Sequence, residues 1–111
     1  MKMGPKELNF TGEFVVPNKT PYETWQQHIN TYFFASKIVK GKTVLDVACG
    51  VGYGSNHLAK KGAKFVVGGD CSKDALEYAK THYEKINLEF IRLDARSLPL
   101  RNDCFDVIVS F

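Results

Sequence analysis

The sequence contains little that would specify a secreted, membrane-spanning or metal-binding protein. It has 3 cysteines, Cys49, Cys71 and Cys104, and no C-x-x-C pair. Neither a disulfide framework nor a zinc site is therefore expected, and we predict no metal ligands. No apolar run reaches the ~20 residues that a membrane-spanning helix needs. The N-terminal stretch MKMGPKELNF also lacks the apolar core of a signal peptide, so we expect a cytoplasmic protein with no membrane partner.

The charge balance does not identify a partner either. The 15 Lys and Arg residues stand against 12 Asp and Glu residues, which gives a net charge of +3. The lysines are scattered along the sequence, and their close pair is Lys60 and Lys61. We interpret them as a solvated surface, and nucleic-acid binding is not expected.

The composition is typical of one globular domain that covers the whole chain, residues 1–111, with 44% hydrophobic and 24% charged residues. Residues 1–19 lack a sustained period and are expected to form an N-terminal arm. The next segment predicts a long amphipathic helix over residues 20–41. Thr20 and Glu23 have the spacing of a capping box, and Gly41 provides a stop signal.

Beyond this helix, short apolar runs alternate with helical patterns. Strands are expected over Thr43–Val47, Lys64–Asp70, Leu88–Leu93 and Phe105–Phe111, and helices over Ser55–Lys61 and from Ser72 to about Lys85. This alternation predicts right-handed crossovers and a parallel sheet of the α/β class.

Three glycines alternate in the stretch VLDVACGVGYG, directly after the first apolar run. Ligands of parallel sheets bind at the carboxyl ends of the strands. Gly50 and Gly52 can adopt backbone conformations closed to other residues, and without a Cβ they let a ligand contact the backbone. The helix that follows offers free N–H groups to an anionic group. A merely tight turn is the alternative, and we favour a ligand-binding loop.

The spacing and the neighbouring acids narrow the choice of ligand. The glycines match neither the G-x-G-x-x-G dinucleotide fingerprint nor a P-loop. An NAD-type oxidoreductase is therefore disfavoured. Asp46, Asp70 and Asp94 end three successive strands and should lie on one edge of the sheet. Asp70 has the position to accept hydrogen bonds from a ribose diol. For Asp46 or Asp94 alone a turn or cap role is favoured, but the three acids together at equivalent strand ends favour a ligand-binding role.

Four segments, VLDVACGVGYG, VVGGDCS, FIRLDARSLPL and FDVIVSF, resemble in order and spacing the motifs of class I S-adenosylmethionine-dependent methyltransferases. The similarity covers about residues 43–111. It implies a Rossmann-like three-layer sandwich with a parallel sheet in the order 3-2-1-4, preceded by the arm and the long helix. Residues 42–111 would be the half of the domain that binds S-adenosylmethionine.

The resemblance also implies cofactor-binding residues. The methionyl part would lie along the loop from Asp46 to Gly52, the ribose at Asp70, and the adenine near Asp94. The helix 20–41 would form a lid. The full set of expected cofactor-binding residues is Asp46, Ala48, Cys49, Gly50, Gly52, Asp70, Cys71, Asp94, Ala95, Ser110, Tyr22, His28 and Tyr32. Ala48 departs from the family pattern, which usually has its first glycine there.

The implied activity is in-line (SN2) methyl transfer to an acceptor, for which no general base is obligatory. His28, His57 and His82 are expected in packing or surface roles, and no catalytic residue is predicted. A non-catalytic module that binds S-adenosylmethionine is the alternative function.

The sequence encodes the cofactor half of the implied sheet, so FDVIVSF is expected to form an apolar edge strand open to another chain. We expect a homodimer with a continuous sheet. The alternative is that the chain is a truncated product of a longer enzyme.

Overall fold

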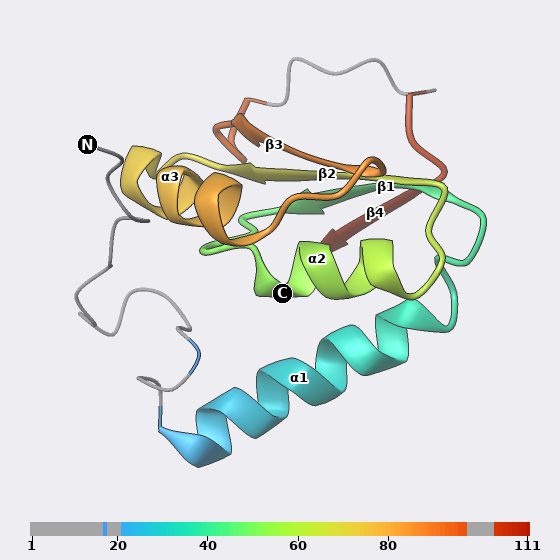
Figure 1. Ribbon diagram of the computed structural model, residues 1–111, viewed down its shortest axis with the longest axis horizontal. Helices are drawn as coiled ribbons and strands as arrows, with labels where there is room; N and C mark the ends of the chain where they lie inside the picture. The colour runs from blue at the N-terminus through green and yellow to red at the C-terminus, as the bar shows by residue number, and fades with distance from the viewer. Residues whose placement is uncertain (1–16, 18–20, 98–103) are drawn as a thin grey trace.

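A computed structural model describes residues 17, 21–97 and 104–111 of the chain (Figure 1). Its centre is a four-stranded, wholly parallel sheet in the order β3-β2-β1-β4, which confirms the predicted α/β class and strand order. The elements are α1 (Tyr22–Ser36), β1 (Thr43–Val47), α2 (Tyr53–Lys60), β2 (Phe65–Asp70), α3 (Lys73–His82), β3 (Leu88–Arg92) and β4 (Val107–Ser110). Within this described part, no helix combines the length and apolarity needed to cross a bilayer.

The register of the strands brings their carboxyl ends to one edge. Val47, the last residue of β1, is paired with Gly69 on one side and with Ser110 on the other. Asp70 then ends β2 beside Arg92, the last residue of β3. The loops that leave β1, β2 and β3 therefore start close together, as the motif order predicts.

The helices of the described residues cover one face of the sheet (Figure 1), so these residues form two of the three layers that the resemblance implies. Val44 of β1, Val66 of β2 and Val109 of β4 are buried there, in one cluster with Tyr32 of α1 and Leu58 of α2. The rings of Trp25 and Tyr53 lie 4.8 Å apart, where α1 meets α2. Because side chains alternate along a strand, Leu45 and Val47 face the opposite side, where they pack with Leu93.

The helix α1 is shorter than the 20–41 segment that the sequence predicts. Pro21 is its N-cap, without a side-chain cap, and Thr20 lies outside the described residues. The helix ends at Ser36 because the chain turns there to reach the sheet. Lys40 forms an antiparallel bridge with Ala63, and the N–H of Gly41 donates to the carbonyl of Gly62 at 2.8 Å.

The helix α3 also ends earlier than expected, at His82 instead of about Lys85. Its start is as predicted, since the Ser72 hydroxyl accepts the N–H of Ala75 at 3.2 Å. At the other end Tyr83 is extended, and the amide of Asn87 donates to the carbonyls of Ala59 and Ala63. These bonds turn the chain into β3.

Among the described residues β4 is an end strand of the sheet, and Ile108 on it is 59% exposed. We predict that this edge pairs with a second copy, and that Ile108→Lys prevents the pairing by placing a charge there. Light scattering should give twice the mass of one chain for the wild type and the mass of one chain for the variant. A wild-type monomer at micromolar concentration would contradict the prediction.

Candidate ligand site at the carboxyl edge

A buried carboxylate lies beneath the loop that follows β1. Asp46 is fully buried. Its Oδ2 accepts the Ser55 hydroxyl at 2.7 Å, and the Tyr32 hydroxyl lies 3.0 Å from Oδ2 and 3.2 Å from Oδ1. The side chain faces the helices because it lies two residues after Val44, which points the same way. Asp46 therefore joins β1 to α1 and α2, and its carboxylate does not reach the edge where the sequence analysis expected it.

Burial raises the pKa of the Asp46 carboxyl to about 6. The hydrogen bonds from Ser55 and Tyr32 oppose this rise, whereas the nearby charge of Asp70 adds to it. Burial also raises the pKa of the Tyr32 phenol, and the charge of Asp46 adds to this effect. Tyr32 therefore remains a donor at neutral pH. Ser55 was missed by the sequence analysis, since nothing in its local sequence marks it as a partner of Asp46.

Two of the three loop glycines make room for the protein's own side chains. Gly52 has a φ of +91°, and a Cβ there would lie 2.7 Å from the Cβ of Ala79 and 2.8 Å from the ring of Phe90. A Cβ at Gly54 would overlap the ring of Tyr32. Gly52 was expected to leave its α-carbon bare for a ligand. In the structure, packing against α3 and β3 requires this glycine.

Asp70 holds the loops after β1 and β2 together. Its Oδ2 accepts the N–H of Gly50 at 2.8 Å, and its Oδ1 accepts the N–H of Ser72 at 2.9 Å. A carboxylate offers about four lone-pair sites, so each oxygen retains acceptor capacity for another donor. The prediction that an acid ends β2 beside the glycine loop is thus met in the geometry. Such a carboxylate can take a pair of hydroxyl groups.

The first residue after β1 has an unusual backbone for its type. Ala48 is exposed and has a φ of +59°, which glycine adopts without strain and alanine does not. This turn directs the N–H of Cys49 to the carbonyl of Gly69 at 2.9 Å. Cys49 is buried with Leu76 and Phe90, and burial raises the pKa of its thiol. Its side chain therefore packs in the core.

The residues expected around an adenine lie on exposed loops. Asp94 is exposed two residues beyond β3, next to the exposed Ala95. Its carboxylate accepts the backbone N–H and the guanidinium of Arg96, each at 2.9 Å, and these bonds lower its pKa. Cys71 is exposed after β2, and its carbonyl accepts from Arg92 at 3.2 Å.

The expected lid residues are separated by the structure. Tyr32 is buried in the core, whereas Tyr22 is 75% exposed at the far end of α1, ~15 Å away along the helix axis. His28 is half-buried, 6.5 Å from the ring of Tyr53, and burial lowers its pKa. Ser110 ends β4 beside Val47 and is exposed at the carboxyl edge. The N-terminal half of α1 is therefore the part that remains a candidate lid.

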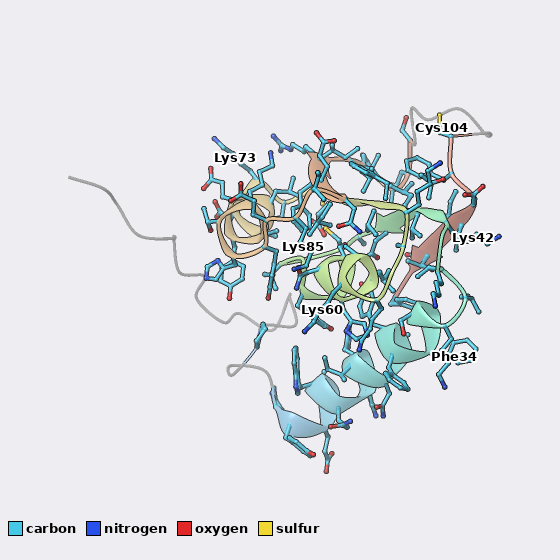
Figure 2. The ribbon with its side chains drawn as sticks, turned by 45° about the vertical axis from the view of Figure 1, so that its right-hand side comes forward. Phe34, Lys42, Lys60, Lys73, Lys85 and Cys104 are labelled. Atoms are coloured by element: carbon cyan, nitrogen blue, oxygen red, sulfur yellow. The ribbon has the colours of Figure 1, made fainter. Side chains whose placement is uncertain are left out.

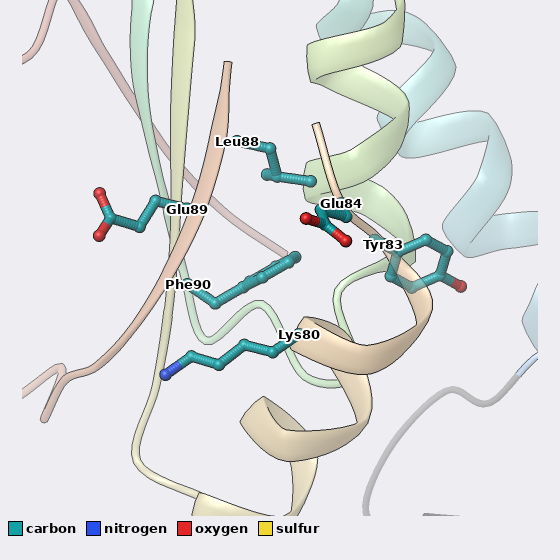
Figure 3. A pocket seen from close by; sticks show the side chains of 6 residues that line it. All are labelled: Lys80, Tyr83, Glu84, Leu88, Glu89 and Phe90. Atoms are coloured by element: carbon teal, nitrogen blue, oxygen red, sulfur yellow. The ribbon is translucent and has the colours of Figure 1, made fainter. Parts of the chain in front are cut away.

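A separate groove of about 370 Å³ lies between the end of α3 and the start of β3. Figure 3 shows Leu88 and Phe90 on the side of β3 that faces α3, with Glu89 on the other side. The groove is remote from the carboxyl ends of the strands and is not part of the candidate site. Across the described ranges, no three His, Cys, Asp or Glu residues are grouped to hold a metal ion.

Comparison with known proteins gives one family. The family model that describes the methyltransferase domain matches residues 44–111 of this chain. A phthiotriol/phenolphthiotriol dimycocerosates methyltransferase of Mycobacterium tuberculosis (strain H37Rv) is 31% identical in an alignment of length 110 that covers 93% of this chain and 41% of that protein. A fatty-acid O-methyltransferase of Mycolicibacterium smegmatis is 33% identical over 73 residues, 65% of this chain and 27% of that protein.

Solved structures agree with these relatives. An S-adenosylmethionine-dependent methyltransferase from Mesorhizobium loti has a TM-score of 0.63 and 28% identity, over 70% of this chain and 38% of that one. The PH0226 protein of Pyrococcus horikoshii has a TM-score of 0.63 and 30% identity, over 82% of this chain and 43% of that one. The chain thus spans less than half the length of the proteins to which it is similar.

The buried carboxyl predicts a pH-dependent stability. The pKa of Asp46 is about 6 in the folded chain, against 3.8 for the unfolded residue. The folded state therefore binds more protons between these values, and its stability falls as the pH rises through them. Relative to Asp46→Asn, the free energy of unfolding of the wild type should fall by about 2 kcal/mol from pH 4 to pH 6. Urea titrations at several pH values measure the free energy of unfolding of both proteins.

Asp106→Asn is the matched control. The N–H and hydroxyl of Thr43 both donate to Asp106 and lower its pKa. The stabilisation that the Asp106 carboxylate provides is present at neutral pH and is lost as the pH falls. Relative to Asp106→Asn, the free energy of unfolding of the wild type should therefore rise with pH. A pH-independent difference between the wild type and Asp46→Asn would contradict the assignment.

The left-handed backbone of Ala48 predicts that Ala48→Gly is stabilising. Relief of ~1–2 kcal/mol of strain should exceed the ~0.4–1 kcal/mol lost because glycine makes the unfolded chain more flexible. Thermal unfolding should show a small rise in stability. Ala59→Gly, inside α2, is the control and should lower stability by ~1 kcal/mol or more. A loss at both positions would show that residue 48 is not strained.

Proposed function

The chain belongs to the methyltransferase domain family, and from this membership we propose that it binds S-adenosylmethionine at the carboxyl edge of the sheet and takes part in methyl transfer. The observation that carries the proposal is the Asp70 carboxylate. It lies between the loops after β1 and β2 and holds the N–H groups of Gly50 and Ser72. A carboxylate in this position suits a ribose diol.

We assign the remaining contacts by their place on the edge. The backbone of Ala48, Cys49 and Gly50 follows β1 directly and would line the methionyl part of the cofactor. Cys71, Asp94 and Ala95, in the loops after β2 and β3, would surround the adenine. Asp94 can serve there while it is bonded to Arg96, because two carboxylate oxygens accept more than two donors.

Asp46 is proposed as a positioning residue and not as a cofactor ligand. Its bonds with Tyr32 and Ser55 fix α1 and α2 against β1. The loop that begins at Ala48 starts two residues later, so its position depends on this anchor. Tyr32 contributes in the same indirect way, while Tyr22 and His28 lie on the part of α1 that can cover the edge.

When bound, S-adenosylmethionine supplies a methyl group on a sulfonium, whose leaving group is already activated. The task of the chain is then to orient the reactants and to exclude water. A general base is needed only where the acceptor must lose a proton. His82 is not suited to that task, because its ring stacks on Tyr78 at 3.7 Å and its Nδ1 lies 2.9 Å from the Tyr78 carbonyl oxygen. The relatives are named as methyltransferases, which favours an enzyme over a non-catalytic binding module.

Asp70→Asn tests the proposed function by titration calorimetry with S-adenosylmethionine. The amide replaces an acceptor oxygen by a donor, so one ribose hydroxyl loses its partner. Loss of a hydrogen bond to a charged group costs ~1.5–3 kcal/mol, which is roughly tenfold or more in affinity. NAD should give no binding heat with the wild type.

Two controls separate ligand contact from loss of structure. Glu89→Gln removes a carboxylate on β3 away from the edge, and Ser72→Ala removes the cap bond to Ala75 beside Asp70. Both should bind S-adenosylmethionine with wild-type affinity, although Ser72→Ala should be less stable by ~1 kcal/mol. An unchanged affinity in Asp70→Asn would refute the assignment of the ribose.

A further inference from the structure

Lysines that are scattered in the sequence gather at the end of the sheet opposite the candidate site. They come from the segments 37–42, 60–64 and 83–87, which precede β1, β2 and β3. We call this surface the amino edge, and its lysines are Lys37, Lys40, Lys42, Lys60, Lys61, Lys64 and Lys85. In Figure 2, Lys42, Lys60 and Lys85 are labelled on this part of the molecule.

Hydrogen bonds hold the three segments side by side. The N–H of Gly41 donates to the carbonyl of Gly62 at 2.8 Å, and the N–H of Lys64 donates to the carbonyl of Lys42 at 2.9 Å. The side chain of Asn87 donates to the carbonyls of Ala59 and Ala63, each at 3.0 Å. The lysines are therefore fixed as one group by the backbone beneath them.

Little negative charge offsets these lysines. Among the described residues, Glu84, Glu89 and Asp106 are the acids on or close to the three segments, and the carboxylate of Asp106 accepts both donors of Thr43. The net charge of the amino edge is therefore strongly positive, although that of the whole chain is +3. Such a patch attracts an anionic surface.

Large apolar side chains lie exposed among the same lysines. Ile86 is 100% exposed, Phe34 is 67% exposed and Ile38 is 53% exposed. Ile38 lies between Lys37 and Lys40, and Ile86 follows Lys85. Basic residues mixed with exposed apolar ones are typical of proteins that lie on a lipid surface.

We propose that the amino edge binds the surface of an anionic membrane. The lysines lie at the lipid headgroups, and Ile38 and Ile86 enter the interfacial region. The aliphatic side chains favour lipid over nucleic acid. In the part of the patch that the structure describes, no arginine is present to bind phosphates in bidentate fashion. The sequence analysis expected no membrane partner because no segment spans a bilayer, but surface binding needs no such segment.

The proposal sets the orientation of the molecule and is independent of the proposed function. Five-residue strands such as β1 and β3 separate the two edges by ~17 Å. The carboxyl edge with Asp70 therefore faces the aqueous phase when the amino edge is on the membrane.

Vesicle sedimentation tests the proposal with the whole chain. Vesicles of phosphatidylcholine with one-third phosphatidylserine should bind the protein, and vesicles of phosphatidylcholine alone should not. The double variant Lys40→Gln with Lys61→Gln should lower the partition coefficient roughly tenfold or more, since each lysine near such a surface contributes measurably. The matched control, Lys73→Gln with Lys80→Gln on α3, changes the charge equally and should bind like the wild type.

Ile38→Ser with Ile86→Ser tests the apolar contribution at constant charge and should also weaken binding to the mixed vesicles. The four substituted positions of the amino edge, Ile38, Lys40, Lys61 and Ile86, are exposed. Thermal unfolding should therefore show that each variant folds. Absence of vesicle binding would overturn the proposal, as would equal losses in the two lysine pairs or no loss in the isoleucine pair. Lysine-dependent binding of a single-stranded RNA oligonucleotide without vesicle binding would overturn it in favour of a nucleic acid.

Discussion

The hydrogen bonds to the buried carboxylate of Asp46 are the interaction on which the rest of the structure depends. A carboxylate taken out of water is costly unless donors replace the lost hydration. Tyr32 from α1 and Ser55 from α2 provide them, so two helices are placed by one side chain of the central strand. The glycines complete the arrangement, because the ring of Tyr32 occupies the space that a side chain at residue 54 would fill.

Local signals in the sequence were sufficient to predict the order of the helices and strands and the position of one acid of the candidate site. Asp70 ends a strand whose apolar run and following cap are visible in seven residues, and the structure has it there. Asp46 looked equivalent, but its side chain points toward the helices, and its partner Tyr32 lies 14 residues earlier. The end of α1 was missed for a similar reason, since the bridge between Lys40 and Ala63 is a contact between distant segments.

The arrangement of charge shows the same limit of sequence reasoning. Lysines spread over some fifty positions appear unrelated in the sequence. A parallel sheet returns the chain to the same end before every strand, so residues one crossover apart, such as Lys40 and Lys64, become neighbours. Asp70 and Asp94 follow the same rule at the opposite end, after β2 and β3. The fold thus gathers most of these lysines at the amino edge.

The attachment of α1 also determines how that helix can move. It is fastened by Tyr32 and the bridge at Lys40 near its C-terminal end, and Trp25 packs against Tyr53 in its N-terminal half. Tyr22 at its beginning is exposed to solvent. The part of α1 without such a support is therefore its first residues, and backbone amides should exchange with solvent fastest there.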